Sequence, residues 1–77
     1  MRIEINKDII ADDEICHGKP VFKGTRIMVS IVLEMLEAGC NTREIVKAYP
    51  SLTKRHIKSA LGFAANLMGR RIGLVAA

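Results

Sequence analysis

The spacing of apolar residues changes at Val29, and this change limits the folds that the chain can adopt. Before Val29, apolar and polar residues alternate over short stretches, as in Arg2 to Asn6 (RIEIN), which is typical of a half-buried strand. From Val29 onward, apolar residues recur at intervals of three and four, which is the period of a helix with one buried face. The sequence therefore predicts a strand-rich arm over residues 1–28, followed by helices.

The rest of the arm is predicted from short local signals. Residues 11–13 are turn-like, and Ile15-Cys16 is expected to form a second strand. The run HGKPVFKGTRI, residues 17–27, combines glycines with basic side chains, but it lacks the spacing of a phosphate-binding P-loop. We interpret it as architecture that joins the arm to the first helix. The residues expected to shape it are Gly18, Pro20, Gly24, Thr25 and Arg26.

Each of these residue types has a local structural reason. Pro20 has no N–H to donate, so it is expected at an edge or at the start of a strand. Gly24 is expected to take a backbone conformation that other residues resist. Thr25 can bond the local backbone. Arg26 is expected to bond carbonyls at a helix C-terminus or at the Tyr49–Pro50 connector.

The first two predicted helices have clear ends. Gly39 is expected to follow the first helix, and Asn41 with Glu44 has the spacing of a capping box at the start of the second. Pro50 ends that second helix. The buried face of the first helix is predicted to hold Val29, Val32, Leu33 and Leu36.

A third, longer helix is predicted from an N-cap at Thr53 to about Met68. Its apolar stripe is Ile57, Ala60, Leu61, Ala64, Leu67 and Met68. The opposite face is expected to carry Arg55, Ser59, Gly62 and Asn66, with Lys58 beside them. Phe63 lies on a flank and is expected to meet either the N-terminal strands or a second subunit.

These elements predict one domain over residues 1–77, with a β-arm (1–28), a three-helix core (29–68) and a C-terminal tail (69–77). The predicted fold class is mainly α. The tight connection at residues 49–52, placed before the last helix, is typical of a helix-turn-helix domain.

Composition favours a homodimer. Hydrophobic residues make up 49% of the 77 residues, but aromatic residues only 4%. A core of this size is marginally stable by itself. Apolar surface is therefore expected to be buried against a second copy, because obligate interfaces resemble a core cut in half.

Charge is distributed unevenly within the net charge of +4. Residues 45–77 contain no acidic side chain. The bases of this segment are Lys47, Lys54, Arg55, Lys58, Arg70 and Arg71. A purely basic segment favours an anionic partner such as DNA.

Several functional classes are disfavoured. Cys16, His17, Cys40 and His56 offer four possible zinc ligands, but the first two are adjacent and the others lie in different elements. The sequence shows no nucleophile–base pair or paired carboxylates, so we expect no enzyme, no cofactor and no metal site. No stretch has the length of a membrane helix, and the N-terminus has no apolar signal region, so a cytoplasmic protein is expected.

Four runs of the sequence resemble the domain-of-unknown-function 433 family over roughly Ile9 to Ala65. They are GKPVFKGTRI (18–27), VSIVLEMLEAG (29–39), EIVKAYPSLT (44–53) and IKSAL (57–61). The resemblance implies a homeodomain-like helix-turn-helix fold behind a β-arm, usually dimeric. It also implies the antitoxin of a type II toxin–antitoxin pair, which binds its own operator and neutralises a PIN-like ribonuclease.

The sequence departs from this family pattern in three places. His17 stands where a glycine is common, and Met28 stands where proline often follows the GTRI run. Lys54-Arg55-His56 opens the third helix where acidic residues are usual. Positive charge at a helix N-terminus opposes the macrodipole, which is acceptable where the charges serve phosphate binding, although drift on an exposed turn is an equal alternative.

Two kinds of interface follow from these observations. The residues expected to contact DNA are Thr53, Lys54, Arg55, Lys58, Ser59 and Asn66. The residues expected to contact a toxin partner are Arg70, Arg71, Ile72, Leu74 and Val75, unless this terminus packs on its own core or frays. The alternatives are a stand-alone helix-turn-helix regulator and a dimeric interaction module that does not bind DNA.

Overall fold

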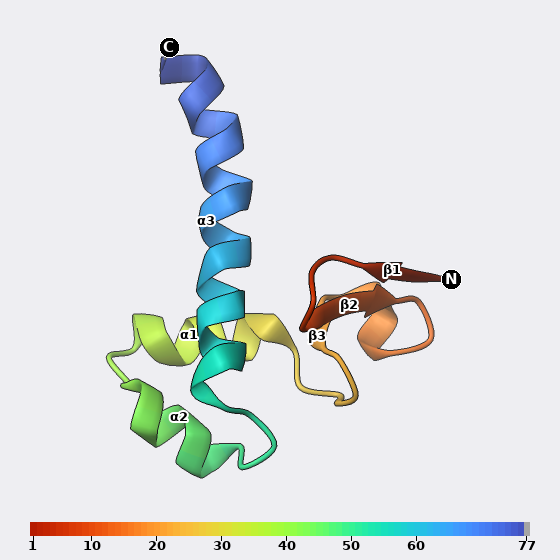
Figure 1. Cartoon of the computed structure of the whole chain (residues 1–77), viewed down its shortest axis with the longest axis vertical. Coiled ribbons are helices and arrows are strands. Elements are labelled where there is room, and N and C mark those ends of the chain that lie inside the picture. Colours follow the sequence, from red (N-terminus) through yellow and green to blue (C-terminus); the bar gives the residue numbers. More distant parts are fainter. Residues whose placement is uncertain (77) are drawn as a thin grey trace.

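The structure is a computed structural model that describes the backbone of residues 1–76 and the side chains of residues 1–69 (Figure 1). Within these residues a three-stranded antiparallel sheet is followed by three helices. The strands are β1 (Arg2–Glu4), β2 (Ile9–Asp12) and β3 (Val21–Phe22), with a 3₁₀ turn, η1 (Cys16–Gly18), between the last two. The helices are α1 (Val29–Glu37), α2 (Thr42–Ala48) and α3 (Lys54–Ala76).

The predicted order of strands before helices is confirmed, but the arm is a complete small sheet. The strand order is β1-β2-β3, with Ile3 opposite Ala11 and Ile9 opposite Phe22. The fold is therefore a small mixed α/β arrangement rather than a mainly α one. None of the helices in the described part of the chain is long and apolar enough to cross a membrane.

The prediction of the second strand was wrong. The second strand, β2, lies at Ile9–Asp12 and not at Ile15-Cys16. Of the turn predicted at residues 11–13, only Asp13 lies outside this strand. Cys16 and the residue after it have φ of 50° and 57°, a left-handed conformation that a strand does not accept.

The β2 strand is buried on both of its faces. Ile9 pairs with Phe22, and both belong to the cluster that packs with the helices. Ile10 pairs with Val21, and both side chains are also buried, outside that cluster. Two consecutive buried isoleucines do not alternate with polar residues, so the period-two pattern does not reveal this strand.

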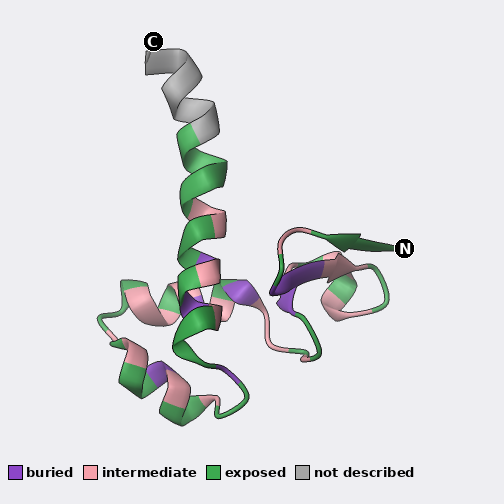
Figure 2. Ribbon diagram, viewed as in Figure 1, coloured by how far each residue is buried: buried purple, intermediate pink, exposed green. Residues whose placement is uncertain are grey.

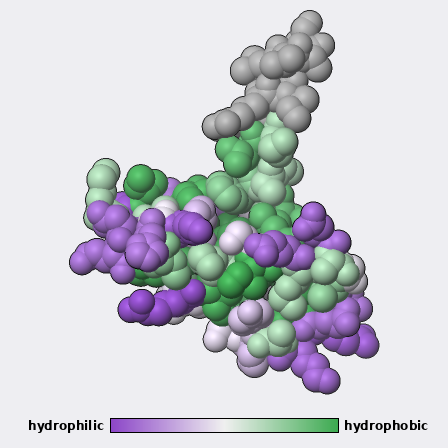
Figure 3. Space-filling model, turned by 180° about the vertical axis from the view of Figure 1, so that it is seen from behind, coloured by the Kyte–Doolittle hydropathy of each residue, from purple (hydrophilic) through white to green (hydrophobic). Residues whose placement is uncertain are grey.

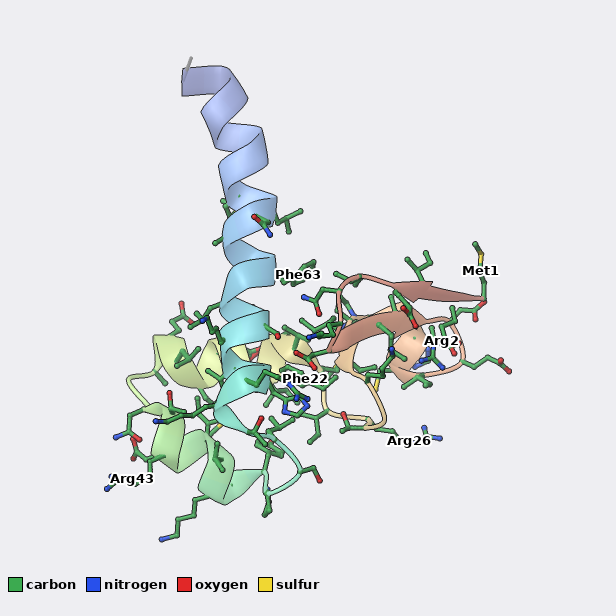
Figure 4. The ribbon with its side chains drawn as sticks, viewed as in Figure 1. Met1, Arg2, Phe22, Arg26, Arg43 and Phe63 are labelled. Atoms are coloured by element: carbon green, nitrogen blue, oxygen red, sulfur yellow. The ribbon has the colours of Figure 1, made fainter. Side chains whose placement is uncertain are left out.

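The main core lies where the sheet meets the lower part of the helices, and buried residues gather there in Figure 2. Its members come from every element except β1 and η1. They are Ile9, Phe22, Val29, Val32, Ile45, Leu52, Ile57 and Ala60. Phe63 packs against this core from α3 and extends on the side where the sheet lies (Figure 4), so the first of its two predicted contacts is the observed one.

The end of α1 and the start of α2 follow the local signals in the sequence. Gly39 has φ of +96°, and the N–H of Cys40 donates to the carbonyl of Met35 at 2.9 Å, which forms a Schellman end for α1. At the start of α2, Asn41 and Glu44 exchange side-chain and backbone hydrogen bonds of 2.9 Å, so the predicted capping box is confirmed.

The segment of residues 17–27 joins the sheet to α1 through local backbone turns and hydrogen bonds. Gly18 and Gly24 have φ of +81° and +80°. The Thr25 hydroxyl donates to the Phe22 carbonyl at 2.8 Å, and the carbonyl of Pro20, just before β3, accepts the first N–H of α1 at 3.0 Å. The expected bonds from the Arg26 guanidinium do not occur among the described residues, because this side chain points away from the body of the molecule (Figure 4).

Helix α3 extends beyond the predicted end at Met68, because its last residue is Ala76. Only Ile57 and Ala60 of its predicted apolar stripe are fully buried. After these residues the helix leaves the body of the molecule, and Figure 1 shows no other element beside its upper half. Within the single chain, the predicted stripe is therefore buried in the first turns of α3 and largely exposed in the turns beyond.

Candidate nucleic-acid interface

One buried carboxylate connects the sheet to α3. Asp8 lies in the turn between β1 and β2, and its side chain is only 7% exposed. Its Oδ2 accepts a hydrogen bond from the Ser59 hydroxyl at 2.5 Å, and its Oδ1 lies 3.2 Å from Nη2 of Arg55. Two side chains predicted to face DNA are therefore engaged with a residue of their own chain.

Backbone contacts hold Asp8 in this position. Its N–H donates to Oδ1 of Asn6 at 2.8 Å, and its carbonyl accepts the N–H of Lys23 at 2.8 Å. The Ser59 hydroxyl and the positive charge of Arg55 lower the pKa of the Asp8 carboxyl below its ordinary value, whereas burial acts in the opposite direction. Asp8 is thus ionised at neutral pH, and its charge offsets that of Arg55.

The start of α3 uses a histidine where capping boxes use glutamate or glutamine. The N–H of Thr53 donates to Nδ1 of His56 at 3.0 Å, and the N–H of His56 donates to the Thr53 carbonyl at 3.0 Å. The imidazole also meets the ring of Phe22 edge to face, with the centroids 5.6 Å apart. Sequence reasoning missed this role for His56, although the three-residue spacing from Thr53 carried the signal.

Besides Arg55, four basic side chains are exposed on α2 and at the start of α3. They are Arg43, Lys47, Lys54 and Lys58, which we call the basic set. Each helix contributes two of them, four residues apart and therefore on one face. No salt bridge to the basic set occurs within residues 1–69.

The connector between α2 and α3, residues 49–53, is anchored in the core by one buried side chain. Leu52 is 1% exposed, and its N–H donates to the carbonyl of Tyr49 at 2.9 Å. Both helices also contribute to the same core, through Ile45 and Ile57. The two pairs of exposed cations are therefore carried by helices that share one core.

The other residues predicted to contact DNA have different surroundings. Asn66 is exposed, two turns beyond Ser59, on the part of α3 that leaves the body. Arg55 remains 68% exposed although it contacts Asp8, so part of its guanidinium is accessible. The predicted toxin-contacting residues, Arg70, Arg71, Ile72, Leu74 and Val75, lie outside the residues whose side chains are described.

The possible zinc ligands do not come together. Over residues 1–69, Asp12, Asp13 and Glu14 form the group of potential metal ligands with three or more members. This acidic group already has partners, because Asp13 binds the terminal amine of Met1 and Asp12 accepts the N–H of Glu14. The arrangement gives no reason to assign a metal.

Comparison with known proteins yields a family for most of the chain. A family model described as "Protein of unknown function (DUF433)" matches residues 9–64. No curated protein and no solved structure matches the chain.

Proposed function

Because this chain belongs to the DUF433 family, whose function is unknown, we propose a function from its own residues: it is a DNA-binding protein of the helix-turn-helix type. In this proposal α2 and the first turns of α3 approach the duplex in the cytoplasm, and the fold is homeodomain-like. The protein has no enzymatic activity of its own. It acts on DNA by binding alone.

The exposure of the basic set supports this proposal most strongly. Phosphate contacts depend on lysine and arginine side chains that are free to reach the backbone of the duplex. Lys54 and Lys58 meet this condition at the start of α3, and Arg43 and Lys47 meet it on α2. The same segment has no acid after Glu44, so no carboxylate of α3 repels the phosphates.

Asp8 restricts which side chains read bases. It fixes Ser59 and one edge of the Arg55 guanidinium, so these residues orient α3 relative to the sheet. Base reading then falls to the exposed part of Arg55 and to Asn66, whose side-chain types pair with guanine and adenine respectively.

The proposal extends to an antitoxin that represses its own operon and neutralises a PIN-like ribonuclease. Its support is the resemblance of the four sequence runs quoted above to antitoxin-like proteins, together with the basic, acid-free end of the chain. A stand-alone regulator is the alternative. Pull-down of the product of the adjacent gene, with the full chain and with a chain ending at residue 69, distinguishes the two roles.

The DNA-binding proposal is tested by gel shift with the protein's own upstream region. We expect the wild-type chain to prefer this fragment over a scrambled fragment of equal length and composition. Equal affinity for both fragments would remove sequence-specific binding from the proposal. Absence of binding to either fragment at low salt would refute DNA binding altogether.

A further inference from the structure

The outer half of α3 exposes an apolar face. Leu61, Leu67 and Met68 are 49%, 45% and 54% exposed. In Figure 3 hydrophobic atoms cover the described part of α3 where it leaves the body of the molecule. Large aliphatic side chains exposed together at helical spacing mark a surface that is buried by a partner.

The spacing of this face is symmetric about Ala64. Leu61 and Leu67 lie three residues on either side of it, and Ala60 and Met68 lie four residues on either side. In an antiparallel pair of helices that cross at residue 64, the residue three positions before the crossing meets the residue three positions after it. Leu61 of one copy thus meets Leu67 of the other, and small Ala64 allows close approach at the crossing point.

The charges beside this face are also complementary between two copies. A groove between α1 and α3 is lined by Ser30, Leu33, Glu34, Glu37 and Ala64, so its rim is acidic. In the antiparallel arrangement the part of the partner's α3 beyond Met68 runs along this groove. The sequence of that part begins with Gly69 and continues with Arg70 and Arg71, which are opposite in charge to the two glutamates. Lys58, which this register places opposite Arg70, lies away from the apolar face of α3.

We propose that a second copy of this chain occupies the face, with the two α3 helices antiparallel, crossing at Ala64, and each end lying over the partner's α1. This inference goes beyond DNA binding and holds for any function of the protein. It also assigns the apolar face to a second copy and not to a toxin.

Sedimentation equilibrium of the full chain tests the proposal with a matched pair of variants. We expect a dimer for the wild type. Leu67→Glu places a charge within the buried interface, opposite Leu61 of the other copy, and should weaken the dimer by at least about 100-fold. Asn66→Glu adds the same charge one residue away, off the face, and should leave the dimer within about threefold of the wild type.

Cross-linking tests the register independently of any loss of folding. In a background with Cys16→Ser and Cys40→Ser, a short bismaleimide should join two chains that carry Ala64→Cys, because packed helix axes are about 8–10 Å apart. The exposed neighbour variant, Ala65→Cys, should react at least about tenfold more slowly, since it points about 100° away.

A monomeric wild type would overturn the proposal, including the case in which the product of a neighbouring gene covers the face. A dimer that Leu67→Glu leaves intact would also overturn it. Equal cross-linking at residues 64 and 65 would overturn the antiparallel register. Loss of the dimer in Leu67→Glu alone, with preferential cross-linking at residue 64, would establish it.

Discussion

Replacement of Asp8 by asparagine removes the charge that connects the sheet to α3 and nearly preserves the shape of the side chain. The carboxylate is 7% exposed, accepts a hydrogen bond from the Ser59 hydroxyl and forms a salt bridge with Arg55. A hydrogen bond to a charged group contributes about 1.5–3 kcal/mol. Because Arg55 is 68% exposed, solvent screens its share to about 0–1 kcal/mol. The asparagine retains one acceptor for Ser59, so we expect a loss of about 2 kcal/mol in unfolding free energy.

A double-mutant cycle measures the coupling energy between Asp8 and Ser59. Urea unfolding is followed by circular dichroism for Asp8→Asn, for Ser59→Ala and for the double variant. The expected coupling energy is about 1–2 kcal/mol, whereas the corresponding cycle with Arg55→Ala should give less than about 1 kcal/mol. If the losses of unfolding free energy in the Ser59 cycle are additive, the hydrogen bond between Asp8 and Ser59 does not connect the sheet to α3 as described.

The pH dependence of the same unfolding free energy gives a second test. The pKa of Asp8 is lowered in the folded state below its ordinary value of 3.8. The folded state therefore binds the proton more weakly than the unfolded state, so the stabilisation is complete above about pH 5 and is lost as pH falls below 4. Asp8→Asn should lose less stability than the wild type over this interval. Parallel pH profiles for the two proteins would contradict the lowered pKa.

Three further outcomes are expected. His17 has φ of +57°, so His17→Gly should raise the unfolding free energy by up to about 1 kcal/mol, measured by urea unfolding; destabilisation would contradict the strain. His56→Ala should lower it by about 1–2 kcal/mol, and His56→Gln should lower it less because glutamine also accepts the Thr53 N–H. Lys54 is ten residues from Ala64, so the starts of α3 in the proposed dimer lie about 30 Å apart. Footprinting should therefore show an inverted repeat with half-site centres about 10 bp apart, and a single undivided half-site would exclude this geometry.

Local signals correctly predicted where α1 ends and where α2 begins, but not where α3 ends. Gly39 ends α1, and the Asn41–Glu44 pair caps the start of α2. Each of these signals acts within one helical turn, so neighbouring residues in the sequence suffice to identify the helix end. The sheet was harder to predict because Ile9 and Ile10 are both buried, on opposite faces, and give no alternation. The left-handed residues Cys16 and His17 are not glycines, so their conformation was also hidden from the sequence.

The environment of the candidate interface depends on a contact between distant residues. Helical spacing correctly placed Arg55 and Ser59 on one face of α3, opposite the buried Ile57. It gave no indication that Asp8, 51 residues before Ser59, covers part of this face. Periodicity separates the apolar face of a helix from its polar face but carries no information about the neighbouring elements. It therefore does not distinguish a polar face exposed to solvent from one that contacts a buried carboxylate.

The salt dependence of DNA binding tests the proposed role of the basic set most directly. The affinity of the full chain for its upstream region should be measured by fluorescence anisotropy between low and moderate salt. One double variant carries Lys54→Ala and Lys58→Ala. The control double variant carries Lys7→Ala and Lys19→Ala, which remove the same charge from exposed positions in the arm.

The α3 double variant should make the fall of log affinity with log salt concentration less steep, changing the slope by about 2, because two phosphate contacts are lost. The arm variant should keep the slope of the wild type. Equal slopes for both double variants would show that the start of α3 does not contact the DNA backbone, and the proposed interface would be wrong.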